Sequence, residues 1–404
     1  MIDQGVVRIV RSIPRLCCVV VVAAVFLPAA AQTEFDPSVA AEAVYSDNLE
    51  HFGTSFSSDT AYRLGLDLPV TRDLRTGSVR FRYNARRFGY QDSGTLDHTD
   101  HLVEFSSSTV LGRKSTLTAS VDFSSAQTQA DLESLEDPAI VLTERTTRER
   151  FSADVAYGRQ IGAFWDWGLS AGTGTVSHDL IDGYSSGLGG TTVEDRSHTW
   201  LSTSFGRQVS KRTNLGFGMQ AQQNRLDLSG DEEFQTANLR IRHQLDPNNS
   251  LAVAIGGFST SSEIPDVPDR TGVNLQVTYN RDFRRVEFDL FAGRRPTPGG
   301  DLKGTATNTN VGVRLAPPLG AQTVLWDLSA VYVRRDPADL DDPEIDTLGI
   351  RAGVTWLARP EIGVRGSVSH TQQSSDTTVL DNDVLNTSLG VVWFPRGRQR
   401  RNQE

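Results

Sequence analysis

Residues that could carry acid–base or metal chemistry lie close together at Asp97-His98-Thr99-Asp100-His101. Imidazole and carboxylate groups act as general acids and bases, and two histidines three positions apart are candidates to share a metal ion. The surrounding residues are polar and predict a loop, and the sequence identifies no partner that would orient either ring. We therefore favour a solvated loop here, and keep hydrolysis dependent on His98 and His101 as an alternative.

A second group of charged residues is acidic and also falls in a predicted loop. Its spacing is not that of a calcium-binding helix-loop-helix, and no glycine stands at the required turn position. The chain also has no phosphate-binding loop and no Gly-x-Gly-x-x-Gly dinucleotide fingerprint. The sequence thus predicts a non-enzyme without a cofactor, a metal or catalytic residues. The acidic residues are Asp336, Asp339, Asp341, Asp342, Glu344 and Asp346.

The first 31 residues have the order of a secretory signal peptide. Three arginines precede an apolar run from Leu16 to Leu27, and Ala29-Ala30-Ala31 follows it. A charged start, an apolar centre and a small-residue exit are typical of a cleaved signal, and the run is too short to span a bilayer comfortably. We predict a signal peptide over residues 1–31. The arginines are Arg8, Arg11 and Arg15.

The composition argues against several further classes of protein. The two cysteines, Cys17 and Cys18, lie inside the predicted signal, so the mature chain would have neither disulfides nor thiol ligands. The chain has 50 acidic residues against 40 lysines and arginines, a formal charge of −10, which disfavours a nucleic-acid partner. No later stretch has the length of uninterrupted apolar sequence that a membrane-spanning helix requires. If the protein spans a membrane, it must do so with strands.

From about residue 38 onward, short segments alternate apolar with polar residues and are separated by Gly, Asp, Asn and Pro. Leu117, Val121 and Phe123 alternate with Thr118 and Asp122, which gives one apolar and one polar face. About 18 such segments can be counted, within the range of outer-membrane barrels. They centre on Ala43, Leu66, Phe81, Phe105, Val121, Val155, Leu169, Leu201, Phe217, Leu239, Val253, Leu275, Phe288, Val313, Trp326, Ile350, Val364 and Leu389.

The breaks between segments alternate between short and long. Short breaks fall at 112–115, 246–249, 281–285 and 358–360, and longer ones at 124–147, 178–195 and 334–344. Short periplasmic turns and long extracellular loops are typical of a transmembrane barrel, and neither propellers nor β-solenoids predict this alternation. We predict an all-β protein with a single antiparallel barrel of 16–18 strands over residues 32–394, whose first strand pairs with its last. Aromatic residues near strand ends predict an interfacial girdle: Trp165, Trp167, Trp326, Trp356, Trp393, Tyr157 and Tyr279.

The stretch Val44-Tyr45-Ser46-Asp47-Asn48-Leu49 resembles the opening of a family of outer-membrane β-barrel porins of Gram-negative bacteria. In that family a Tyr-x-Asp-Asn stretch ends the first strand, and an aromatic third strand follows, here with Phe81, Tyr83, Phe88 and Tyr90. The resemblance covers most of the mature chain and implies a barrel associated with exopolysaccharide or exosortase systems, without catalytic residues. The chain departs from the usual aromatic terminus, because Trp393-Phe394 precede Pro395 and a basic tail over residues 395–404.

If the apolar face looks outward, charged side chains on the other face line a lumen, since charges facing lipid cost a few kcal/mol each. Basic and acidic residues group on different strands, which predicts either a transverse field across a pore or salt bridges that plug the barrel. Inward glycines, among them Gly168, Gly172, Gly216, Gly218 and Gly256, are expected to leave room. The predicted pore-lining residues are Arg63, Arg80, Arg82, Arg351, Arg365, Glu104, Asp122, Asp154 and Asp166.

These features predict a porin-like channel or conduit in the bacterial outer membrane for small polar or saccharide solutes. The expected partners are outer-membrane lipid, lipopolysaccharide and the assembly machinery. Two alternatives stay open: a closed structural or docking barrel serving surface-polysaccharide or protein-sorting machinery, with 124–147 as a working loop, and an outer-membrane hydrolase.

Overall fold

The protein forms one antiparallel sheet in the computed structural model, which describes residues 33–47, 58–127, 146–180, 195–227, 230–263, 268–283, 286–297, 306–317, 323–337, 344–376 and 381–395. The predicted signal peptide with its two cysteines and most of the basic tail lie outside these residues. The strands are β1 (Thr33–Phe35), β2 (Ser38–Ser46), β3 (Asp59–Leu74), β4 (Gly77–Tyr90), β5 (His98–Val110), β6 (Ser115–Gln127), β7 (Thr146–Ile161), β8 (Trp165–Leu180), β9 (Arg196–Ser210), β10 (Thr213–Leu226), β11 (Gly230–Asp246), β12 (Asn249–Ser262), β13 (Arg270–Asp282), β14 (Glu287–Thr297), β15 (Ala306–Ala316), β16 (Val324–Pro337), β17 (Ile345–Arg359), β18 (Ile362–Ser375) and β19 (Asn382–Trp393).

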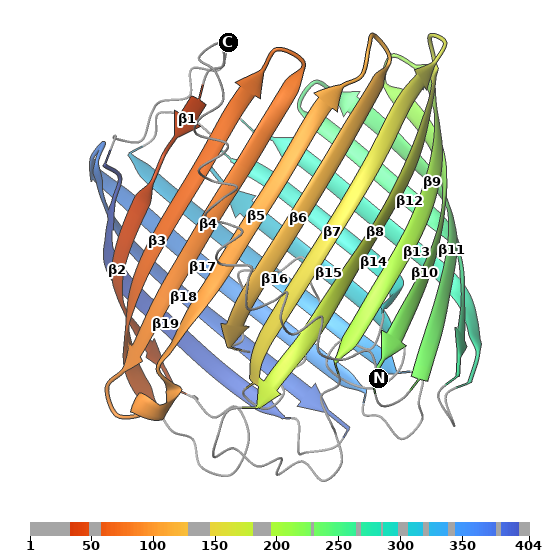
Figure 1. Cartoon of the computed structure of the whole chain (residues 1–404). Coiled ribbons are helices and arrows are strands. Elements are labelled where there is room, and N and C mark those ends of the chain that lie inside the picture. Colours follow the sequence, from red (N-terminus) through yellow and green to blue (C-terminus); the bar gives the residue numbers. More distant parts are fainter. Residues whose placement is uncertain are drawn as a thin grey trace, which may run out of the picture.

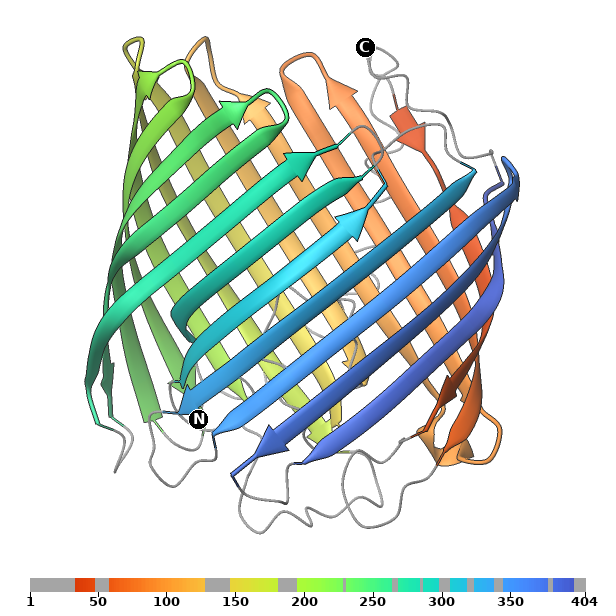
Figure 2. The same ribbon diagram turned by 180° about the vertical axis from the view of Figure 1, so that it is seen from behind.

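The sheet closes on itself. Each strand from β2 to β19 pairs with its neighbours in the chain, and β19 pairs with β2 from Trp393↔Val39 to Asn386↔Ser46. The result is a tilted cylinder, seen from opposite sides in Figures 1 and 2. Closure removes the sheet edges, whose unpaired backbone groups would cost several kcal/mol each in hydrocarbon. The predicted barrel and its pairing of first and last strands are confirmed.

One short strand was not predicted. β1 pairs only with β3, at Val70 to Arg72, and is separated from β2 by Asp36 and Pro37. Proline has no backbone N–H to donate to a ladder, so it interrupts the pairing between the two pieces. The backbone of Asp36 still donates to Pro69 at 3.4 Å. β1 therefore extends the barrel wall beyond the end of β19.

The two rims differ in loop length, mostly as predicted. Four connections at one rim, the upper rim in Figure 1, have only two residues: 75–76, 211–212, 247–248 and 360–361. At the other rim the connections are mostly longer, and the one between β10 and β11, residues 227–229, is an exception. We call these ends the short-turn rim and the long-loop rim.

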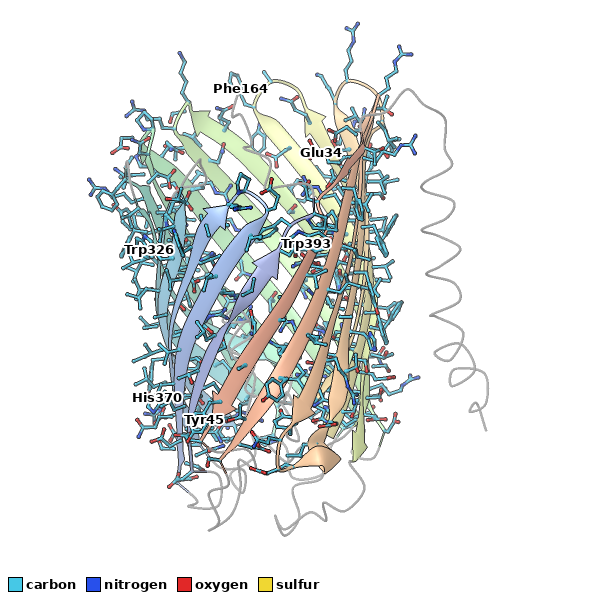
Figure 3. All side chains as sticks on the ribbon, turned by 90° about the vertical axis from the view of Figure 1, so that its left-hand side faces the viewer. Glu34, Tyr45, Phe164, Trp326, His370 and Trp393 are labelled. Carbon is cyan, nitrogen blue, oxygen red and sulfur yellow. The ribbon has the colours of Figure 1, made fainter. Side chains whose placement is uncertain are left out.

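The outer face of the barrel is apolar. Leu64, Leu239 and Leu389 are 59–65% exposed, although large aliphatic side chains are normally inside a soluble protein. Trp165, Trp356 and Trp393 face outward near the short-turn rim and are about half exposed. Figure 3 shows Trp326 and Trp393 toward this end, and Tyr45 toward the long-loop rim. An apolar band with aromatic residues toward its two edges matches the lipid-facing surface of a transmembrane barrel.

The inner face changes along the barrel axis. On β11 the inward side chains of Glu232 and Phe234, near the long-loop rim, are buried, whereas those of Arg240 and Arg242 are exposed. On β16 the inward residues from Ser329 to Arg335 are all buried toward the same rim. Open space inside the barrel therefore lies toward the short-turn rim. In the described parts of the chain, no helix is long and apolar enough to cross a membrane.

Candidate pore lining

The strand register places all nine predicted pore-lining residues on the inner face. Residues paired directly across an antiparallel ladder share a face, so a row can be followed around the wall. One such row runs from Arg82 through Glu104 and Asp122 to Ser152. Another runs from Gly390 through Glu42 and Arg63 to Phe88. Period-two alternation from the sequence was enough to find this face, because no described strand of the barrel changes face in the middle.

The seam between the first and last barrel strands contains an ion pair. Arg63 on β3 donates from Nε to Glu42 on β2 at 2.8 Å, and the Glu42 side chain is only 2% exposed. Gly390 on β19 makes room for it, because a Cβ there would lie 2.3 Å from Glu42 Cγ. Sequence reasoning missed Glu42 as a lumen residue, since the short β2 segment Ala-Ala-Glu-Ala-Val has little polar alternation.

The basic and acidic residues do not form two separate facing walls. Arg82 on β4 donates to Asp67 on β3 at 2.8 Å and lies 3.5 Å from Glu104 on β5. On the other side of the β2–β19 seam, Arg351 lies 3.7 Å from Asp327. Because these arginines are engaged by carboxylates, each contributes less to any field across the lumen than an unpaired charge would.

The predicted acidic residues lie on four consecutive strands, β5 to β8. Glu104 is directly opposite Asp122, whose carboxylate accepts a hydrogen bond from Ser152 at 3.4 Å. Asp154 accepts one from Ser120. Asp166 lies at the short-turn end of β8 against Gly206, where an added Cβ would come within 2.2 Å of its carboxylate. This side of the lumen is therefore acidic and partly hydrogen-bonded.

Six inward arginines form no ion pair with any residue that the structure describes, Arg295 on β14 among them. Arg80 and Arg365 belong to the predicted set, and Arg240, Arg242 and Arg314 were recognised only as lumen-facing charges. These five lie in the short-turn half of their strands, whereas Arg295 lies toward the long-loop rim. The unpaired positive charge of the lumen is thus concentrated at the end that has open space.

The expectation that inward glycines leave room is only partly correct. A Cβ on Gly172 would lie 2.7 Å from the Trp200 ring, one on Gly168 2.8 Å from Ser204 Oγ, and one on Gly256 2.3 Å from Asn238 Oδ1. Neighbouring side chains already occupy that space. At Gly172 an aromatic side chain covers a glycine on the next strand, a known packing arrangement in β-sheets. At Gly216 and Gly218 the nearest atoms are 3.6 Å or more away, so room remains there.

The Asp97–His101 cluster is not in a loop, as was predicted: His98 to His101 form the start of β5, and Asp97 immediately precedes it. His98 faces inward, is buried, and stacks on Phe88 with ring centroids 4.6 Å apart, while its Nδ1 lies 2.7 Å from the Leu96 carbonyl. His101 faces outward and hydrogen-bonds Tyr83 Oη at 3.0 Å. Positions i and i+3 of a strand point to opposite faces, so the two rings cannot share a metal ion. Among the described residues, no group of three or more potential ligands could hold one.

Three residues of the predicted acidic loop are described, and each has a partner. Asp336 lies 3.9 Å from Arg294, Glu344 pairs with Arg334, and Asp346 accepts a hydrogen bond from Tyr332 at 2.6 Å. Asp339, Asp341 and Asp342 lie outside the described residues. The described acidic residues of this loop therefore form ion pairs and hydrogen bonds at the long-loop rim.

At the base of another long connection, Asp195 precedes β9 and accepts the backbone N–H of His178 at 2.8 Å. Burial opposes ionisation of this carboxyl, but its side-chain and backbone hydrogen bonds with His178 outweigh burial and lower the Asp195 pKa. Asp195 thus joins the two strands where the connection between β8 and β9 begins and ends.

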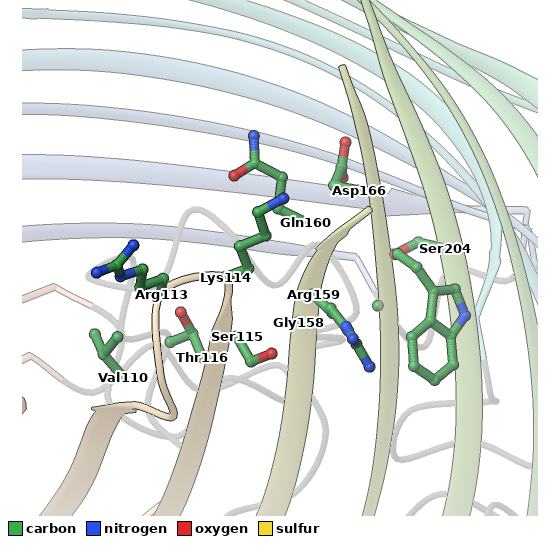
Figure 4. A pocket seen from close by; sticks show the side chains of 12 residues that line it. Val110, Arg113, Lys114, Ser115, Thr116, Gly158, Arg159, Gln160, Asp166 and Ser204 are labelled. Carbon is green, nitrogen blue, oxygen red and sulfur yellow. The ribbon is translucent and has the colours of Figure 1, made fainter. Parts of the chain in front are cut away.

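A groove of about 490 Å³ opens at the short-turn rim beside the turn between β5 and β6 (Figure 4). Arg113 and Lys114 from the turn and Asp166, Gln160 and Ser204 from the following strands are among its lining residues. Because it combines both charge signs with polar groups, the groove shows no preference for one charge. It lies at the short-turn rim of the barrel wall.

A closed ring of strands with an apolar, aromatic-edged exterior and a charged interior defines a transmembrane β-barrel of the bacterial outer-membrane type. No family model matches the chain, and no curated protein matches it. Similar solved structures include OccK2 (OpdF) of Pseudomonas aeruginosa, 11% identical over 90% of this chain and 99% of that chain, with a TM-score of 0.47. OccK9 (OpdG) of the same organism is 12% identical over 90% and 98% of the two chains, with a TM-score of 0.48. OccAB3 of Acinetobacter baumannii is 10% identical over 89% and 99%, with a TM-score of 0.46. The assignment to this class rests on the chain's own strand pairing and faces.

Proposed function

We propose that this barrel is a passive channel of the outer membrane for small polar solutes, saccharides among them. The observation that carries the proposal is the charged inner face of an eighteen-strand ring, β2 to β19. Barrels of eight strands are filled by their own side chains, whereas those of 16 to 18 strands are wide enough for an aqueous channel. The exposed inward arginines near the short-turn rim support a water-filled lumen at that end.

The test is conductance of the purified protein in planar bilayers. Replacing Arg80 and Arg82 together by glutamate should shift ion selectivity toward cations, because both side chains lie on the inner face. Arg207→Glu is the matched control, since Arg207 lies on the outer face beside Trp165 near the same rim. A folded barrel that conducts no ions would contradict the proposal.

A second candidate is a closed barrel that docks partners through its loops. It is favoured by the burial of inward side chains toward the long-loop rim, including Val331 and Val333, which are 7% and 6% exposed. Such a barrel would not conduct, and replacing residues 128–145 by a two-residue Asn-Gly turn should abolish partner retention. That replacement keeps all residues of β6 and β7, which removal of 124–147 would not. A role in exopolysaccharide or protein-sorting systems is what the resemblance implies for this candidate.

A further inference from the structure

The inner wall formed by β10 to β13 differs in chemistry from the rest of the lumen. Between its two rims it presents mainly amides, hydroxyls, glycines and alanines, such as Asn214 and Gln220 on β10, Ala254 on β12 and Gln276 on β13. The charged residues of this wall other than Arg240 and Arg242 lie near the rims: Glu232, Asp246, Arg270 and Asp282. Two arginines therefore stand alone in an uncharged polar surface.

Neither guanidinium group has a carboxylate partner among the residues that the structure describes. Arg240 and Arg242 are exposed, and neither forms an ion pair with any residue in the described ranges. Asp166 is the acidic residue in the same row as Arg240, three strands away. Gly216 and Gly206 lie between them, so the two backbones are roughly 14 Å apart at the spacing of neighbouring strands. The positive charge is therefore available to a solute.

The wall beside these arginines also has space. Gly216 is directly opposite Arg240, and a Cβ built on it would still be 3.6 Å from its nearest neighbour. Along β10, the amides of Gln220, Gln222 and Asn224 form a chain of hydrogen bonds of 3.3 and 2.8 Å toward the long-loop rim. Amides both donate and accept, so they suit the hydroxyl groups of a sugar.

We propose that Arg240 and Arg242 form a binding site for a small hydroxylated anion, of the class of sugar acids and sugar phosphates. A guanidinium binds carboxylate or phosphate through two parallel hydrogen bonds, and the surrounding amides bind hydroxyls. The two arginines lie two positions apart on one strand face, about 7 Å along the barrel, so an anion can be passed from one to the other. This inference rests on the proposed channel function and specifies its solute.

The experiment measures block of single-channel current by galacturonate, galactose 6-phosphate and neutral galactose. Both anions, or one of them, should block the wild-type channel more strongly than galactose, and the R240Q/R242Q variant should weaken that block by about tenfold or more. The R207Q variant removes one positive charge from the outer face and should leave the block unchanged. Block by only one of the two anions assigns the site to carboxylates or to phosphates.

Equal block by galactose and the anions, or block that survives in R240Q/R242Q, would overturn the site while leaving the channel function intact. If the wild-type barrel does not conduct, the channel proposal fails. Calorimetric titration of galacturonate and galactose 6-phosphate into the detergent-solubilised barrel then tests the site by itself. Binding of either anion that is lost in R240Q/R242Q supports the site, and absence of binding by both in wild type rejects it.

Discussion

The carboxylate of Asp47 accepts a hydrogen bond from the backbone N–H of Leu385 at 2.7 Å, although the two residues are 338 positions apart in the chain. The Asp47 N–H in turn donates to the Leu385 carbonyl at 3.2 Å. These bonds continue the β2–β19 ladder one residue beyond its last paired position, Ser46↔Asn386. The aspartate of the Tyr-x-Asp-Asn stretch thus helps to close the barrel at the long-loop rim.

Asp47→Ala should destabilise the seam by about 1–3 kcal/mol, because the Leu385 N–H loses its side-chain acceptor. Asp47→Asn keeps an oxygen at this position and should behave like wild type. The measurement is the temperature at which the compact band on a semi-native gel converts to the unfolded band. Equal conversion temperatures for the two variants would contradict this role of the carboxylate.

Glu42 and Arg63 provide a second test of the seam. Glu42→Ala should destabilise the barrel by about 3 kcal/mol, since it leaves the poorly exposed Arg63 without its carboxylate. The E42A/R63M double variant should recover much of this loss, because no charge is then left uncompensated. Guanidinium-induced unfolding in detergent micelles measures both variants. A double variant less stable than E42A would rule out this explanation.

The sequence was sufficient to predict the closed barrel because its main signal, alternation of apolar and polar residues, is local. All 18 predicted segments coincide with strands. The sequence did not predict which inward charges pair, since Arg82 meets both Asp67 and Glu104 through a register that alternation alone does not specify. The sequence also predicted free space at Gly172, which Trp200 occupies. Trp200 lies on the next strand, 28 positions away in sequence, and only the strand register brings the two residues together.

Gly172→Ala should destabilise the barrel, because its Cβ would lie 2.7 Å from Trp200 Nε1 and 2.9 Å from the Ala153 carbonyl oxygen. Overpacking of this kind costs about 1–3 kcal/mol. The matched control is Gly218→Ala, where the nearest atom is 3.7 Å away. Heat-modifiability on gels should separate the two variants, and similar conversion temperatures would show that Trp200 moves aside without cost.

Arg80 and Arg82 face the same lumen but should respond differently to removal of their charge. Arg80→Gln removes an unpaired charge and should lower anion preference with little effect on stability. Arg82→Gln should lower anion preference and also lower stability, by about 1 kcal/mol at most, because the ion pairs of Arg82 with Asp67 and Glu104 are partly exposed. Reversal potentials under a salt gradient, combined with unfolding curves, measure both effects. If Arg82→Gln proved as stable as Arg80→Gln, the ion pairs of Arg82 would contribute nothing to the fold.

His98 and His101 distinguish a structural role from a catalytic one. Removing the buried His98 ring with His98→Ala should destabilise the long-loop rim, because the ring packs on Phe88 and contacts the Leu96 carbonyl. His101→Ala, on the outer face, should lose the hydrogen bond and the ring stacking with Tyr83 and cost about 1 kcal/mol. Since the rings face opposite sides of the wall, calorimetric titration with Zn²⁺ should give the same result for wild type and for the H98A/H101A variant. Zinc binding that depends on both histidines, or hydrolytic activity lost in either single variant, would require a different arrangement of β5.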